Sequence, residues 1–240
     1  MSEQNKKIIA GLHRKDLTNI KFASALLDMA IEEKKDDLNF ALHQAKEVQQ
    51  IAAKESRKKN SIEFATLYWK ATLMLAPYFF EDFLYYMEKD RAPDKRFYMP
   101  RRRTLKVVVD DLQDLEDGKL DFYGLSMPPR VGKSTICIFF MAWIMGKRPN
   151  SHNAMSGHSG LLADGFYSEA LNLMELDVPE EKRQYHFLDI FPQTFLQKKS
   201  AEKKEITLND PDRFATLTCR GIDGTWTGAV DISLDGYLYV

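Results

Sequence analysis

Apolar residues recur three or four positions apart through the first 59 residues, and the positions between them are mostly Lys, Glu, Asp and Gln. A spacing near 3.6 residues is typical of amphipathic helices, so helices are predicted from residue 5 to about residue 59. The charged run at 34–37 favours a break into two helices, although one long helix through it also fits the pattern. Ser61 is suited to cap the start of a further helix, and Pro77 should kink or divide that helix.

Beyond residue 95 short apolar runs alternate with helical patterns, which indicates a second kind of architecture. The expected order is a helix from Pro100 or Arg101 to near Gly118, a strand at 122–127, a helix from 133 to about 145, a strand beginning at 153, a helix at 161–174, and paired strands at 205–208 and 214–219 joined by a turn at 209–212. Strands that alternate with helices favour a parallel sheet with helices on both faces. The predicted fold class is therefore α/β: a three-layer α/β/α domain over residues 96–240, preceded by an all-helical region over residues 1–95.

Composition narrows the classes of protein that fit. With 240 residues, 44% of them hydrophobic, the chain can bury a substantial core. The formal net charge is −1, so a contact with nucleic acid must come from a local patch or from several assembled copies. Cys137 and Cys219 lack a metal-binding spacing and are most simply interpreted as reduced, intracellular thiols. The longest apolar stretch, at 64–86, is interrupted by charges and a proline, which predicts buried helices and no membrane span.

The segment 127–135 reads M-P-P-R-V-G-K-S-T and lies between a predicted strand and a predicted helix. A Gly-Lys-Ser at such a helix start predicts a phosphate-binding loop, because backbone N–H groups and the helix N-terminus both favour an anion there. Lys133 would reach the β- and γ-phosphates of ATP, Ser134 would take Mg²⁺, and Gly132 would let the backbone approach closely. The usual first glycine is replaced by Met127. The alternative is a tight strand-to-helix turn with a solvated Lys133.

Four neighbouring residues complete the predicted site. Pro129 and Val131 belong to the loop backbone, and Thr135 could assist at the α-phosphate or simply pack at the helix start. The Arg130 guanidinium could spread its donors over the γ-phosphate as negative charge builds there. Its alternative role is to fix the loop through a carboxylate.

The run Pro-Pro-Arg-x-Gly-Lys-Ser resembles the deviant Walker A motif of the large terminase subunits of tailed bacteriophages, ATP-driven motors that package DNA. Three later segments resemble the same family: a second strand and turn at 153–159 with the helix after it, a Gly-rich loop at 220–228, and the Walker B strand at 234–240. The resemblance covers about residues 95–240, and the Walker A run is its most specific part.

The resemblance implies a P-loop NTPase core that binds ATP and Mg²⁺ and couples hydrolysis to translocation of double-stranded DNA into a procapsid. Lys133 and Arg130 would be the catalytic residues. Tyr98 and Arg102 lie where the family's adenine-recognition segment would sit, although the Gln often found there is missing. Arg220 could act on a neighbouring subunit's phosphate, or simply end a strand at the surface. The implied partners are a portal protein, a small terminase subunit and further copies in a homo-oligomeric ring, in the cytoplasm of an infected bacterial host.

The carboxylates of the Walker B motif are the part of the family pattern that this sequence matches least well. Asp231 and Asp235 do not end an apolar strand, and the better strand is 237–240. We therefore expect the catalytic carboxylates beyond Val240, and the nuclease domain of the family further on. The chain should bind ATP and hydrolyse it poorly. Two alternatives stay open: another P-loop NTPase, such as a helicase-like motor, and a non-catalytic interaction or scaffold fragment that binds no nucleotide.

Overall fold

The computed structural model describes residues 16–209, 213–224, 226 and 232–240 of the chain. The chain divides into two compact units, residues 1–86 and residues 87–240. The boundary predicted from the sequence, at residue 95, lies a little further along. Each unit is described by itself below.

The first unit is helical throughout its described part, as predicted. Its elements are η1 (Asp16–Thr18), α2 (Ile20–Glu33), α3 (Leu38–Lys59), α4 (Ile62–Leu75) and α5 (Phe80–Met87). The break expected at 34–37 separates α2 from α3, where Asp37 accepts a hydrogen bond from the Phe40 N–H at 3.0 Å. Ser61 caps α4 by accepting from the Phe64 N–H at 3.4 Å. The helix ends before Pro77, because proline cannot supply the N–H that would continue it.

A polar cluster lies within the apolar core of this unit. Asp82 is only 3% exposed, and its carboxylate accepts from Lys46 Nζ at 2.7 Å and from Gln49 Nε2 at 2.5 Å. Gln49 also donates to the Thr72 hydroxyl at 3.0 Å. The cluster therefore joins α3, α4 and α5 through groups that would be costly to bury alone.

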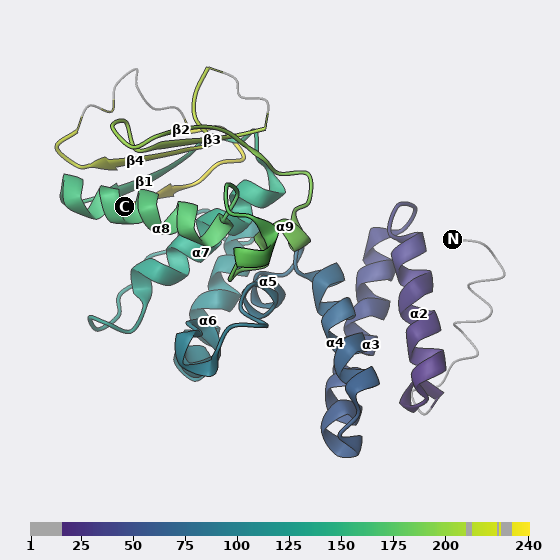
Figure 1. Ribbon diagram of the computed structural model, residues 1–240. Helices are drawn as coiled ribbons and strands as arrows, with labels where there is room; N and C mark the ends of the chain where they lie inside the picture. The colour runs from purple at the N-terminus through teal and green to yellow at the C-terminus, as the bar shows by residue number, and fades with distance from the viewer. Residues whose placement is uncertain (1–15, 210–212, 225, 227–231) are drawn as a thin grey trace. The chain divides into compact units, whose positions relative to one another are not determined.

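The second unit is a mixed α/β structure (Figure 1). Its elements in chain order are η2 (Pro93–Lys95), α6 (Tyr98–Glu116), α7 (Lys133–Lys147), β1 (Asn153–Gly157), α8 (Gly160–Met174), η3 (Glu180–Lys182), α9 (Phe187–Ile190), β2 (Leu196–Ser200), β3 (Glu205–Leu208), β4 (Leu217–Gly221) and β5 (Leu238–Tyr239). The expected helices therefore lie close to their predicted bounds. Gly118 follows α6 with φ 69°, the left-handed conformation that ends many helices.

The five strands form one sheet in the order β2-β3-β4-β1-β5. β1 runs parallel to β4 and β5, whereas β3 is antiparallel to both β2 and β4. The predicted pairing of β3 with β4 is confirmed, with Ile206 opposite Leu217. The predicted parallel pairing is found for β1 with β4 and β5 only. The sheet is mixed, because the short connection between β3 and β4 leaves no room for the crossover that parallel neighbours need.

The helices of this unit lie on one side of the sheet in Figure 1. α8 packs on β4 and β1, α7 packs against α8, and α6 packs against α7. In the part of the chain that the structure describes, a helical layer on the other face is not seen. The three-layer arrangement is thus not found here, although the α/β class is.

The predicted strand at 122–127 is not part of the sheet. The segment has no ladder partner among the described residues, and the Phe122 side chain is 83% exposed. Together with β5 it lines one cavity. The neighbouring β5 pairs through only two residues, Leu238 and Tyr239, so a ladder on its outer edge would gain few hydrogen bonds against the entropy of ordering another strand.

Candidate phosphate-binding site

The segment before α7 turns sharply through two residues with positive φ. Gly132 has φ 100° and is the residue that immediately precedes the helix. Glycine adopts this conformation without steric cost because it has no Cβ. Arg130 also has a positive φ, 68°, which costs roughly 1 kcal/mol for a residue with a side chain. Gly132 therefore allows the chain to turn sharply just before α7.

Helix α7 begins at Lys133, as the phosphate-loop prediction requires. The first intrahelical hydrogen bond joins the Ile136 N–H to the Gly132 carbonyl at 3.0 Å. The N–H groups of residues 133–135 have no intrahelical acceptor, as at every helix start. Within the described chain, no side chain caps this end. These three donors, together with the partial positive charge of a 15-residue helix, can bind an anion.

Lys133 and Ser134 lie differently from one another. Lys133 is exposed, whereas Ser134 is half-buried and hydrogen-bonded to the Tyr239 hydroxyl of β5. Burial raises the pKa of Tyr239, and the bond to Ser134 partly offsets that rise. The first turn of α7 is thus anchored to the sheet through Ser134, and Lys133 is available to a ligand. Thr135 is half-buried beside them.

The two residues predicted to contact adenine differ in how accessible they are. Tyr98 is completely buried in α6, so its ring offers no surface to a nucleotide. Arg102 is exposed on the same helix. Phe97 and Arg101 lie against the loop instead: a Cβ atom built on Gly132 would be 2.5 Å from the Phe97 ring and 3.7 Å from Arg101 Cδ. Arg101 donates to the Phe97 carbonyl at 3.0 Å and lies over its ring.

The sequence prediction missed Phe97 and Arg101 for an identifiable reason. Residues four positions apart share a helix face, so 97 with 101 and 98 with 102 are equally good pairs. Nothing in the local pattern says which face of α6 meets the loop. In the structure Tyr98 is buried, and the face of α6 with Phe97 and Arg101 lies against the loop.

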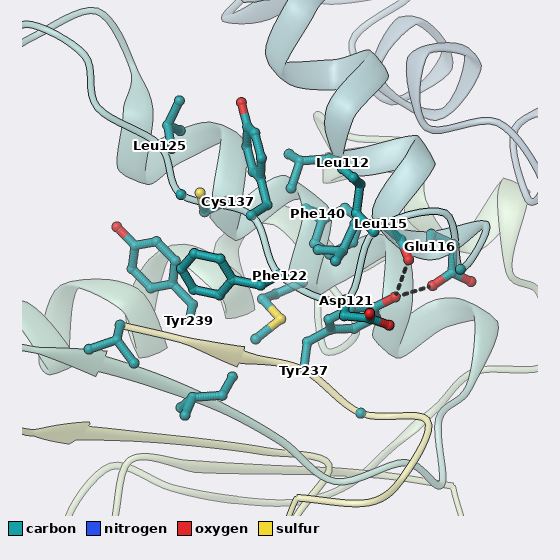
Figure 2. A pocket seen from close by; sticks show the side chains of 18 of the residues that line it. Leu112, Leu115, Glu116, Asp121, Phe122, Leu125, Cys137, Phe140, Tyr237 and Tyr239 are labelled. Carbon is teal, nitrogen blue, oxygen red and sulfur yellow. Dashed lines mark hydrogen bonds between the residues drawn. The ribbon is translucent and has the colours of Figure 1, made fainter.

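A cavity of about 950 Å³ lies beside the first turns of α7 (Figure 2). Its walls are the segment 120–125, the end of α6, the first half of α7 and β5. Leu125, Cys137 and Tyr239 gather toward one end of the view, and Glu116, Asp121 and Tyr237 toward the other. Lys133 also lines the cavity, so a ligand at the loop would have this space next to it.

The acidic part of the cavity wall is held by an ion cluster. Glu116 accepts from Arg148 at 2.6 and 2.9 Å, from Lys147 at 2.6 Å, and from the Tyr237 hydroxyl at 3.0 Å. Burial opposes ionisation of Glu116, but the bonds from Arg148 and Lys147 outweigh it and hold its pKa below the ordinary value. Burial and the Glu116 charge raise the pKa of Tyr237, which therefore stays a donor. Arg148 also donates to the Asp235 carbonyl at 3.0 Å. The cluster joins the far end of α7 to the segment that enters β5.

The two thiols of the chain are chemically quiet. Cys137 and Cys219 are free and buried, and burial raises the pKa of each to about 12. A thiol at such a pKa is protonated at neutral pH and is a poor nucleophile. Although Cys137 lines the cavity, we assign it no chemistry.

The Gly-rich loop predicted at 220–228 lies only partly within the described residues, and Asp231 lies outside them. Arg220 is on β4, 20% exposed at its side chain, with Nη2 3.6 Å from Glu205 Oε1. Asp235 lies in the turn before β5, where the Gly236 N–H donates to the Ser233 carbonyl at 2.9 Å. Asp235 lines the same cavity as Lys133 and pairs with Arg148.

Comparisons of the chain with protein-family models, with curated proteins and with solved structures found no match. No helix among the described residues has both the length and the apolar character needed to span a bilayer. Those residues also hold no group of three or more His, Cys, Asp or Glu side chains placed to bind a metal ion.

Proposed function

We propose that residues 129–135 bind the phosphates of ATP and that the chain carries the ATP-binding part of a DNA-packaging motor of the large-terminase type. Binding of ATP phosphates is supported by the Gly-Lys-Ser sequence together with the backbone conformation of that segment. Gly132 is left-handed, α7 starts at the next residue, and Lys133 is exposed there.

Each residue of the loop has a role in this proposal. The N–H groups of 133–135 would hold phosphate oxygens, and Lys133 would neutralise the charge of the β- and γ-phosphates. Arg130 is exposed at the turn and would contribute further donors to the γ-phosphate. Pro129 and Val131 flank Arg130 and would complete the loop through their backbone.

The Ser134 hydroxyl would be the protein ligand for Mg²⁺, and its partner Tyr239 is neutral and would leave the hydroxyl oxygen able to accept the ion. Mg²⁺, when bound, neutralises charge between the β- and γ-phosphates. Hydrolysis also needs a carboxylate to orient water. Two of the carboxylates that line the cavity, Glu116 and Asp235, pair with Arg148. We therefore expect binding without efficient turnover.

The test is binding of a fluorescent ATP analogue with Mg²⁺ to the full chain. Lys133→Ala should weaken binding at least about tenfold, because it removes a charged donor to phosphate. Lys198→Ala is the matched control, since Lys198 is an exposed lysine on β2, the opposite edge strand of the sheet from β5. Equal affinity of the folded Lys133→Ala variant and the wild type would reject the phosphate loop.

The motor assignment rests on the resemblance of the Walker A run and needs its own test. A packaging motor predicts that the chain with MgATP prefers duplex DNA. A helicase-like motor predicts a preference for a single strand, and a scaffold fragment predicts no nucleotide binding. Fluorescence anisotropy with one labelled sequence in both forms separates the two motors, and binding of the ATP analogue separates both from the scaffold. Duplex DNA, a portal protein, a small terminase subunit and copies of this chain in a ring are the partners that the proposal implies, in the cytoplasm of an infected bacterium.

A further inference from the structure

An aromatic ring fills the space beside the glycine of the loop. A Cβ atom on Gly132 would lie 2.5 Å from Cε2 and 2.9 Å from Cζ of Phe97. The same ring stacks on Phe139 of α7, with centroids 5.5 Å apart and planes inclined by 11°. Phe97 therefore contacts both the loop and the helix that the loop begins. Its position in the sequence, more than 30 residues before the loop, gives no sign of this.

A buried carboxylate holds the backbone of Phe97. Glu88 is 2% exposed; its Oε1 accepts from the Phe97 N–H at 2.7 Å and its Oε2 from the Tyr98 N–H at 3.0 Å. These bonds satisfy two donors at the start of α6 from outside the helix. Burial raises the pKa of Glu88, while the same two bonds and the charges of Arg91 and Arg96 act against the rise. Phe97 is thus fixed at its backbone by Glu88 and at its ring by Phe139.

We propose that Phe97 is a positioning residue of the phosphate loop, held by Glu88 and keeping Gly132 in its left-handed conformation. A loop that is already arranged binds its ligand without the entropic cost of ordering. Without the ring, Gly132 would sample the many other conformations open to glycine. Phe97 touches no phosphate in this proposal. Its effect on nucleotide affinity rests on the proposed function, but its effect on the loop does not.

The loop itself is tested first, without nucleotide, by hydrogen exchange of the Ile136 amide, whose hydrogen bond to the Gly132 carbonyl closes the first turn of α7. Phe97→Ala should speed exchange there about tenfold, because the loop opens more often. Phe97→Tyr keeps the ring and should exchange like the wild type. The matched control is Phe187→Ala, which removes a ring that is 1% exposed and packs on Phe191, a neighbour of Gly146 near the opposite end of α7. Unchanged loop exchange in folded Phe97→Ala, or equal acceleration in Phe187→Ala, would overturn the inference.

Nucleotide affinity is then measured in the same variants. Phe97→Ala should weaken MgATP binding about tenfold, or 1.4 kcal/mol, and Phe97→Tyr should restore it. In a Gly132→Ala background, loss of the ring should cost less, because the ring there also collides with the new methyl group. Additive losses would contradict direct action on Gly132.

The two proposals fail separately. A folded wild-type chain that binds no MgATP would reject the proposed function, while the exchange data still decide the role of Phe97. Binding that depends on Lys133, together with loop exchange that ignores Phe97, would reject the positioning role alone.

Discussion

The two units bury their charged groups for different purposes. In the helical unit, Asp82 meets Lys46 and Gln49, and the cluster fixes how helices pack side by side. In the α/β unit, Glu88 and Glu116 act at the ends of elements: Glu88 holds the start of α6, and Glu116 holds the region after α7 and before β5. Buried polarity in the first unit stabilises a core. In the second it sets the edges of the loop and cavity.

The largest effect should come from Asp82→Ala. It leaves Lys46 without its carboxylate and Gln49 with only the Thr72 hydroxyl as acceptor, which should lower the free energy of unfolding by about 3 kcal/mol. Urea denaturation followed by far-ultraviolet circular dichroism measures it. A loss below about 1 kcal/mol would show that the cluster is solvated and that the contrast between the units is false.

Glu116→Gln should cost about 2 kcal/mol at neutral pH, because Arg148 and Lys147 lose a charged acceptor. The pKa of Glu116 is lowered in the folded state. Its contribution is therefore complete above the pKa of the unfolded chain and is lost as pH falls through the folded value. The difference between wild type and variant should shrink in acid. A difference in unfolding free energy that is the same at pH 7 and in acid would contradict this reading.

A smaller effect separates two glycines of the α/β unit. Gly118→Ala should cost about 1 kcal/mol, since φ is 69° although no heavy atom lies within 4 Å of the new methyl group. Gly165→Ala lies inside α8, also with open space, and should stabilise by about 0.5–1 kcal/mol. Thermal unfolding of both variants gives the signs. The same sign in both would mean that backbone conformation does not govern Gly118.

The smallest effect belongs to a surface pair. Lys70 and Asp28 join at 2.6 Å, with side chains 48% and 54% exposed. Asp28→Ala should change stability by about 0.5 kcal/mol or less, and the change should vanish in high salt. A cost approaching that of Asp82→Ala would remove burial as the explanation for the core cluster.

The sequence was most informative where structure is local. Helical periodicity placed α2 to α4, Ser61 and Pro77 gave correct ends, and the Gly-Lys-Ser run gave the start of α7. Sequence patterns were less informative where the structure depends on contacts between distant segments. The strand at 122–127 had the right residues, but strand formation depends on a partner edge that periodicity cannot see.

The candidate site divides in the same way. Residues 129–135 are contiguous and could be identified from their order alone. Phe97, Tyr239 and the Glu116 cluster reach the region from three other parts of the chain, and no spacing rule connects them. Phe97 and Tyr98 are adjacent in the sequence and about 100° apart around the helix. Only tertiary packing shows that the Phe97 ring lies beside Gly132 while Tyr98 is buried.

The state of the two cysteines has a practical consequence for fluorescence work. Because burial raises their pKa values to about 12, Cys137 and Cys219 are protonated at pH 7, and both side chains are buried. Maleimide reagents should therefore react very slowly with the native thiols. A single cysteine introduced at the exposed position 198 would therefore react selectively with a dye. Neither native cysteine would have to be replaced first.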